Sequence, residues 1–381
     1  MCENSGSHNR FRATDHACAE APREHRDHRL RTRIVNSIRE LPLGSFAFVM
    51  ATGIISVGAQ LADLPVLAWA LFGIAAIGYG VLWLLMIIRL ILIRRQRWSD
   101  LIGSASAPEC LTIVAGTCVL GSQVVLLVGN VTCGLALWFL GGVLWILLLY
   151  AFFLASFVIE PKPTLERGLT GTWLLATVST ESVAILGTLL ASHLGSWRDS
   201  LFLISLSLYL LGGFLYALII TMITYRLIFI PLSADMLTPP YWISMGAEAI
   251  TVVAGAHLIM KAADWTIVQE LLPFLKGLTL FFWVTATWWI PLLLALGVWR
   301  HVYQQMPMHY QSQYWSLVFP LGMYATSTFE IGRLLDLPVF SAGAYLVLYV
   351  AVAAWLITFL GLIQAIMEHL RGASDEREVA P

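Results

Sequence analysis

Ten long apolar segments restrict the fold of this chain more than any other feature. They lie near residues 43–62, 66–93, 108–129, 133–158, 170–192, 200–230, 240–260, 267–298, 313–335 and 339–367. A helix of about 20 mostly apolar residues crosses the hydrocarbon core of a bilayer. Only 12% of the residues are charged, against about 25% in soluble domains. The sequence therefore predicts an all-α polytopic membrane protein with ten transmembrane helices.

The positive charges between these segments predict the orientation. Short loops rich in arginine and lysine tend to stay in the cytoplasm. If there are ten spans, most of these positive charges lie on one side of the membrane: Arg23, Arg26, Arg29, Arg31, Arg33, Arg39, Arg89, Arg94, Arg95, Arg97, Lys162, Arg167, Arg226, Arg300 and Arg371. The other side holds only Arg198, Lys261, Lys276 and Arg333. We therefore expect a multi-pass protein of the plasma membrane with both termini in the cytoplasm.

The ends of the chain differ in composition from the apolar part. Residues 1–39 are rich in arginine and histidine and lack apolar periodicity, which predicts a disordered cytoplasmic tail. A transmembrane domain over 40–370 and a short cytoplasmic tail over 371–381 complete the predicted organisation. The N-terminal tail includes His16, Cys18, His25 and His28, but their spacing matches no structural zinc pattern. The five cysteines do not form a disulfide framework.

Odd-numbered and even-numbered segments differ in kind. The fifth, "TGTWLLATVSTESVAILG", is small and faintly polar, whereas the fourth, "LWFLGGVLWILLLYAFFLASFV", is bulky and aromatic. Helix–helix contacts in membranes favour small residues, and lipid favours large apolar ones. We therefore expect five helical hairpins, with odd helices inside and even helices outside, in a pseudo-fivefold arrangement. Composition does not decide whether their axis is a pore or is packed shut, and a bundle held by scattered polar contacts is the alternative.

The ninth segment, "YWSLVFPLGMYATSTFEIG", combines unusual features. Pro320 deprives the carbonyl of Ser316 of its helical partner and favours a bend, and Phe319 stands directly before it. Thr326 and Ser327 add hydroxyl groups further along. Beside a pore, the free carbonyl could meet water or substrate. A packing kink is the alternative explanation.

Charged residues within the segments have open roles. Glu181 and Glu248 lie about halfway along their helices, where an ionised carboxylate is costly unless it is paired, hydrated or protonated. They are candidate proton carriers, structural hydrogen-bond partners or determinants of selectivity, and His257 is a possible partner of Glu248. Glu330 and Arg333, three residues apart at the predicted outer mouth, share a helix face and are expected to pair.

Four segments carry a family resemblance: "LPLGSFAFVMATGIISVGA", "TGTWLLATVSTESVAILG", "YWISMGAEAITVVAGA" and "YWSLVFPLGMYATST". Over residues 40–370 the chain resembles the tellurite-resistance/dicarboxylate transporter family, which is related to slow-type anion channels and malate and sulfite permeases. The resemblance implies five hairpins around a central pore, commonly in a homotrimer in the lipid bilayer. It implies passive or proton-linked transport of small anions, either C4-dicarboxylates such as malate or inorganic oxyanions such as tellurite and sulfite. It also implies that Phe319, before Pro320, is the pore gate.

Polar side chains in the odd segments are candidates for the substrate path, because an unhydrated anion needs hydrogen-bond donors. They are Ser56, Ser179, Thr180, His257, Ser316, Thr326 and Ser327. Each could equally bond a neighbouring backbone carbonyl. A partner-regulated sensor that uses the tail is the alternative function. A membrane enzyme is less favoured, because no HExxH or Gly-x-Ser-x-Gly motif occurs. We predict no catalytic residue, metal, cofactor or nucleic-acid partner.

Overall fold

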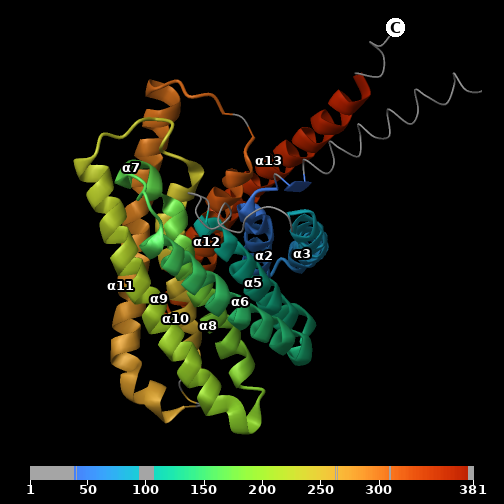
Figure 1. The fold of residues 1–381 in the computed structure, drawn as a ribbon. Coiled ribbons are helices and arrows are strands. Elements are labelled where there is room, and N and C mark those ends of the chain that lie inside the picture. Colours follow the sequence, from blue (N-terminus) through green and yellow to red (C-terminus); the bar gives the residue numbers. More distant parts are fainter. Residues whose placement is uncertain are drawn as a thin grey trace, which may run out of the picture.

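The protein is a helical bundle in the computed structural model, which describes residues 38–39, 41–93, 107–261, 263, 265–308 and 310–375 (Figure 1). No strand occurs in these described ranges, which confirms the predicted all-α class. Nine helices in the described part of the chain are long and apolar enough to cross a membrane. The predicted tail falls outside the described residues, apart from residues 38–39.

Five helices built from the odd-numbered segments form the inner layer. They are α2 (Ala47–Leu61), α5 (Thr112–Gln123), α8 (Leu175–Ala191), α10 (Ile243–Met260) and α12 (Trp315–Leu335). Each follows a short 3-10 turn: η1 (Leu43–Phe46), η2 (Ala107–Leu111), η4 (Gly171–Leu174), η6 (Pro239–Trp242) and η9 (Ser312–Tyr314). Proline suits such starts, because the first turn of a helix needs no backbone N–H from it. Pro239 is the first residue of η6, Pro108 is the second residue of η2, and Pro42 directly precedes η1.

The inner helices form a closed ring. In order around the ring, α2 contacts α5, α5 contacts α8, α8 contacts α10, α10 contacts α12, and α12 contacts α2. Close approach depends on glycine at several of these contacts. A Cβ atom on Gly53 would lie 2.6 Å from Cγ1 of Val119, and one on Gly322 would lie 2.8 Å from Cγ1 of Ile55. The small residues of the odd segments therefore serve helix packing.

Five outer helices surround this ring. They are α3 (Pro65–Ile93), α6 (Val131–Val158), α9 (Arg198–Phe229), α11 (Thr266–Val298) and α13 (Val339–Asp375). Each packs against the inner helix that precedes it, so the five hairpins are present. In each outer helix, 17–44% of an apolar 18-residue stretch is buried. The corresponding share is 67–94% in the inner helices that hydropathy identifies as spans. The inside–outside alternation is therefore confirmed, while pseudo-fivefold symmetry stays a prediction.

Two differences from the predicted segments have clear causes. Helix α12 is absent from the nine apolar spans of the described part, because polar residues such as Thr326, Ser327 and Glu330 make up much of it. Its place in the ring explains this composition, since all three are buried against other helices. Helix α13 continues to Asp375, into the predicted C-terminal tail. The other predicted spans agree with the helices to within about 2–4 residues.

Arginines at the ends of outer helices hold the segments that lead into the ring. The guanidinium group of Arg89 on α3 donates a hydrogen bond to the carbonyl of Leu41, 2.7 Å away, just before η1. Arg300, directly after α11, donates in the same way to the carbonyl of Leu237, just before η6. These bonds satisfy backbone acceptors that lie outside the helices. They fix the starts of α2 and α10 relative to the outer layer.

Candidate functional site

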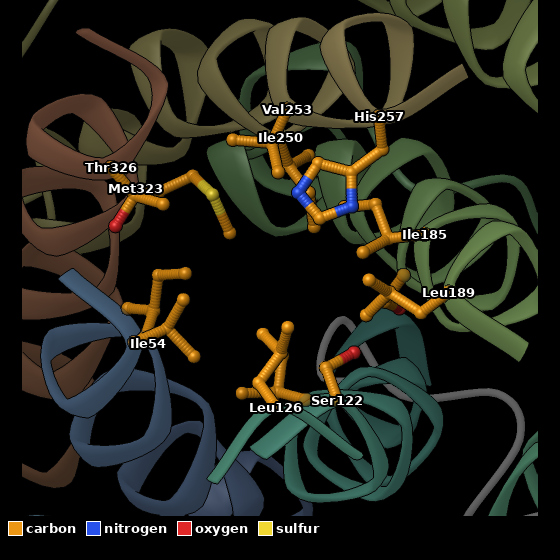
Figure 2. Close-up of a pocket in the computed structure, with 13 residues that line it drawn as sticks. Ile54, Ser122, Leu126, Ile185, Leu189, Ile250, Val253, His257, Met323 and Thr326 are labelled. Carbon is orange, nitrogen blue, oxygen red and sulfur yellow. The ribbon is translucent and has the colours of Figure 1, made fainter. Parts of the chain in front are cut away.

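The site lies in the middle of the ring, where all five inner helices meet one pocket (Figure 2). Its empty volume is ≈ 430 Å³. Thirteen side chains line it: Ile54, Val57, Val119, Ser122, Leu126, Ser182, Ile185, Leu189, Ile250, Val253, His257, Met323 and Thr326. Figure 2 shows the labelled side chains arranged around an open centre. We refer to this space as the axial pocket.

The axial pocket follows a regular helical register. Helix α5 and its extension supply residues 119, 122 and 126, α8 supplies 182, 185 and 189, and α10 supplies 250, 253 and 257. Spacings of three and four residues place side chains on one helix face. These residues lie between the middle of each helix and its C-terminal end or beyond. The five inner helices therefore run in the same direction, and the pocket extends from their middle toward their C-terminal ends.

The lining of the axial pocket is apolar and carries no permanent charge. Its polar groups are His257 and the hydroxyls of Ser122, Ser182 and Thr326. Each hydroxyl donates to a carbonyl of its own helix: Ser122 to Cys118, Ser182 to Ser179 and Thr326 to Gly322, over 2.9–3.0 Å. Such bonds use the hydroxyl hydrogen and leave lone pairs toward the pocket. Among the described residues that line the pocket, His257 is therefore the only one whose side chain has an N–H group to donate.

His257 forms a pair across two inner helices. Its Nε2 atom lies 3.7 Å from Oε1 of Glu330 on α12. Glu330 is buried, and its other oxygen, Oε2, has no hydrogen-bond partner. The expected pair of Glu330 with Arg333 is thus wrong, and His257 is not the partner of Glu248, which the sequence left as a possibility. Arg333 instead donates to the carbonyl of Leu61 at the end of α2, 3.3 Å away.

One helical turn from the axial pocket, toward the helix N-termini, the ring is tightly closed. Four positions before the first pocket residue, each inner helix has a buried residue: Met50, Ala115, Val178, Gly246 and Phe319. Phe319 is the largest of these and is 1% exposed. It shares a helix face with Met323 and Thr326, which line the pocket. The ring of Phe319 therefore lies at the inner end of the pocket, among smaller neighbours.

Contacts on both sides of α12 fix this orientation. A Cβ atom on Gly246 of α10 would lie 2.7 Å from Cγ of Pro320, so Pro320 packs against α10. Gly322 packs against Ile55 of α2 in the same way. The arc of α12 between these two contacts includes Phe319. Helix α12 is continuous through Pro320. Pro320 therefore packs against the neighbouring helix α10 and does not interrupt α12. Ser316 is half-buried in the first turn of α12.

The predicted hydroxyl residues are distributed unevenly around the axial pocket. Thr326 lines it, whereas Ser56 donates to the carbonyl of Ala68 on α3, 2.7 Å away. Thr180 accepts a hydrogen bond from Nε1 of Trp145 on α6 over 2.8 Å. Ser179 and Ser327 are buried and donate within their own helices, over 3.1 and 3.0 Å. Ser56 and Thr180 therefore face outer helices.

The two glutamates at mid-helix, Glu181 and Glu248, lie behind the ring. A Cβ atom on Gly212 of α9 would be 2.2 Å from Oε1 of Glu181, so the Glu181 carboxyl group packs against this outer helix. Glu248 lines a separate cavity between α9 and α11. Neither is among the residues of the axial pocket. The two carboxyl groups therefore face away from the axis.

Sequence reasoning missed most of the apolar lining of the axial pocket. Ser122, Ser182 and Met323 line it, and so do the aliphatic residues around them. Every inner helix is small and mildly polar on all sides, so composition does not distinguish its axial face. The shared spacing of three and then four residues on α5, α8 and α10 is the signal that identifies this face. It becomes visible only when the helices are aligned with one another.

Comparisons with known proteins agree with this architecture. The family profile described as "Voltage-dependent anion channel" matches residues 40–363. Two uncharacterized transporters of Methanocaldococcus jannaschii are 22% and 24% identical over 327 residues, which cover 84% and 83% of this chain and 93% and 90% of the relatives. An uncharacterized membrane protein of Mycobacterium tuberculosis is 38% identical over 173 residues, 43% of this chain and 87% of the relative.

The profile match spans all five hairpins of the bundle, from just before η1 to within α13. It agrees with the family resemblance carried by the first, fifth, seventh and ninth segments. The two full-length relatives are named as transporters. A multi-pass protein with a ring of helices around an axial pocket fits that description. The chain belongs to the voltage-dependent anion channel family.

Proposed function

We propose that the protein conducts small anions through the membrane along the axis of the inner ring. The observation that carries this proposal is the axial pocket, to which all five inner helices contribute and which is free of carboxylates. A carboxylate on this route would repel an anion. Glu181 and Glu248, the two acids that argued against an anion path, lie behind the ring. Membership of the voltage-dependent anion channel family also supports anion conduction.

We propose that Phe319 is the gate of this route. Its buried ring lies at the end of the axial pocket, in a layer whose other members include alanine, valine and glycine. A bulky apolar constriction stops ions because water leaves it. Passage then requires the side chain of Phe319 to move, while Pro320 and Gly246 hold the backbone of α12 in place.

The chemistry of the pocket favours weakly held, monovalent anions. A dianion such as malate is best bound by two cationic groups, and the described residues that line the pocket include no lysine or arginine. His257 is the one lining side chain able to carry a positive charge. Conduction requires weak binding, since a tightly bound ion does not leave. Malate, tellurite and sulfite remain substrates to be tested beside chloride and nitrate.

Orientation, proton linkage and assembly are further parts of the proposal. We infer cytoplasmic termini in the plasma membrane from the arginine bias, so the axial pocket faces outward. A proton-linked mode would use the carboxyl groups of Glu181 or Glu248, behind the ring. Family resemblance supports a homotrimer, in which each subunit has its own axis. Native mass spectrometry of the protein in nanodiscs measures the number of subunits.

The test is reconstitution of the purified protein in planar bilayers and proteoliposomes. We expect anion-selective current that reverses near the equilibrium potential of the anion. A panel of chloride, nitrate, sulfite, tellurite and malate then ranks the substrates. Cation-selective current would contradict the proposal. So would the absence of current from both the parent chain and the Phe319→Ala variant.

A further inference from the structure

A second cavity lies outside the ring, between α9 and α11 and over α10. Its empty volume is ≈ 1130 Å³. Its walls are aromatic and aliphatic: Phe214, Tyr216, Phe281, Phe282, Trp288 and Trp289 are among them. Phe214 is 62% exposed, Phe281 57% and Trp288 59%. These residues belong to outer helices, so the cavity opens sideways toward the bilayer. We call it the lateral crevice.

Glu248 of α10 forms part of the floor of the lateral crevice. Its side chain is 2% exposed, and Oε2 has no hydrogen-bond partner. The hydroxyl groups of Tyr216 and Thr285 lie beside its carboxyl group. Thr285 donates its hydrogen to the carbonyl of Phe281, 2.9 Å away. Tyr216 accepts from Nε1 of Trp289 over 3.1 Å, which leaves its own hydrogen for Glu248.

The floor of the lateral crevice provides too few hydrogen-bond donors for the carboxylate of Glu248. A carboxylate has about four lone-pair sites for hydrogen bonds, and Tyr216 supplies one hydrogen. The ion pairs among the described residues do not include Glu248. A buried carboxylate without a partner is costly in a bilayer, so such a residue marks a binding site or a proton relay. A cation with N–H donors would supply both the hydrogen bonds and the opposite charge that this carboxylate lacks.

The walls of the lateral crevice suit the rest of such a ligand. Aromatic faces attract a cation through their quadrupoles, and the crevice presents several around the carboxyl group. Its aliphatic part, which includes Leu210, Ile220 and Leu278, suits an alkyl chain. Glu248 lies nine residues after Pro239 at the start of its span, about 14 Å along the helix. This depth is close to the middle of a bilayer, beyond the reach of phospholipid head groups.

We propose that the lateral crevice binds a lipophilic primary ammonium ion, a single-chain alkylamine or amino alcohol that enters from the bilayer. Its ammonium group donates to Oε2 of Glu248, and its chain lies along the walls between α9 and α11. The site is separate from the axial pocket and does not depend on the anion route.

The test uses the full-length protein in nanodiscs with radiolabelled dodecylamine, and empty nanodiscs give the background. We expect saturable binding to the protein. Dodecyltrimethylammonium, which has the charge without N–H donors, and dodecanol, which has a donor without the charge, should compete at least about tenfold less well. Glu248→Gln should weaken binding by at least about tenfold, because a neutral amide replaces the carboxylate.

Glu181→Gln is the matched control, because Glu181 is equally buried in the membrane region but packs against Gly212, away from the crevice. It should bind dodecylamine as the parent chain does. Ala217→Trp, on the exposed rim of the crevice, should also block binding and leaves the interior packing intact.

Three results would overturn the proposal. One is the absence of saturable binding, and another is equal competition by dodecanol. The third is disulfide cross-linking between two copies of a Phe214→Cys variant, because a second copy would then cover the crevice. If Glu248→Gln fails to fold, the Ala217→Trp variant decides, since retained binding there places the amine elsewhere.

Discussion

Nε2 of His257 lies 3.7 Å from Oε1 of Glu330, and the two residues belong to different inner helices. His257 lines the axial pocket, and Glu330 is buried one helical turn after Thr326, on the same face of α12. The imidazole is therefore held between the pocket and a carboxyl group. A nearby carboxylate stabilises a positive imidazole but also adds negative charge close to the proposed route. The balance between these two effects sets the potential that an anion meets there.

Removing one partner at a time separates these effects. His257→Gln removes the one group able to carry positive charge among the described lining residues, and we expect the anion conductance to fall by about threefold or more. Glu330→Gln keeps the shape and removes the negative charge, and we expect the conductance to rise by a similar factor. Single-channel current at fixed pH and salt measures both. A fall in conductance for Glu330→Gln would contradict this expectation and would show that Glu330 helps the anion by keeping His257 charged.

The closed layer at Phe319 predicts the strongest effect on flux. Phe319→Ala should raise the anion current by about tenfold or more, because it removes the ring that we propose as the gate. Phe329→Ala is the control on the same helix. Phe329 packs edge-to-face against Tyr345 of α13, with ring centroids 5.1 Å apart, and so faces the outer layer. Equal currents in the two variants would place the gate elsewhere.

The glutamates behind the ring should not influence the anion route directly. Glu181→Gln and Glu248→Gln should each leave the current at symmetrical pH within about twofold of the parent value, since both side chains point away from the axis. A large loss of current would put the carboxyl group on the route. In proteoliposomes, a pH gradient that drives uptake by the parent chain and not by one variant would assign the proton path to that residue.

The start of α8 predicts a defect in stability. A Cβ atom on Gly171 in η4 would lie 2.2 Å from the carbonyl oxygen of Pro240 in η6, and neither backbone can move freely. Gly171→Ala should destabilise the protein by about 2 kcal/mol or more. Gly142→Ala, on outer helix α6 with no atom near the new methyl group, is the control. Fluorescence-detected thermal unfolding in detergent compares them, and equal melting temperatures would contradict the contact.

The layered architecture could be predicted from local features of the chain. Hydropathy marks each crossing segment, because every helix must separately match the thickness of the bilayer. The contrast between small and bulky segments then assigns helices to the inside or outside, because lipid and close helix packing select different side chains. Helix α12 shows the limit of hydropathy alone. Its buried polar residues lower its mean hydropathy, so hydropathy does not identify it as a membrane span, although it completes the ring.

The candidate site depended on how the helices rotate against one another. Ser56 and Thr180 resemble pore-lining residues in sequence, yet their hydroxyls contact α3 and α6. Ser182, two positions after Thr180, lines the axial pocket instead. Since an inner helix is small and mildly polar on all faces, a rotation of one residue, about 100°, changes which side chain meets the axis. No local pattern fixes that angle.

The sequence by itself determined the class, the hairpin order and the family of this protein, because hydropathy and motif spacing are properties of single segments. Only the tertiary structure decided which groups share the axis and which lie behind it. Close contacts between helices, such as Gly246 with Pro320 and Gly322 with Ile55, set the rotation of α12. With that rotation, the side chain of Phe319 points toward the pocket. Glu330 pairs with His257 on another helix, and Arg333 donates a hydrogen bond to a backbone carbonyl.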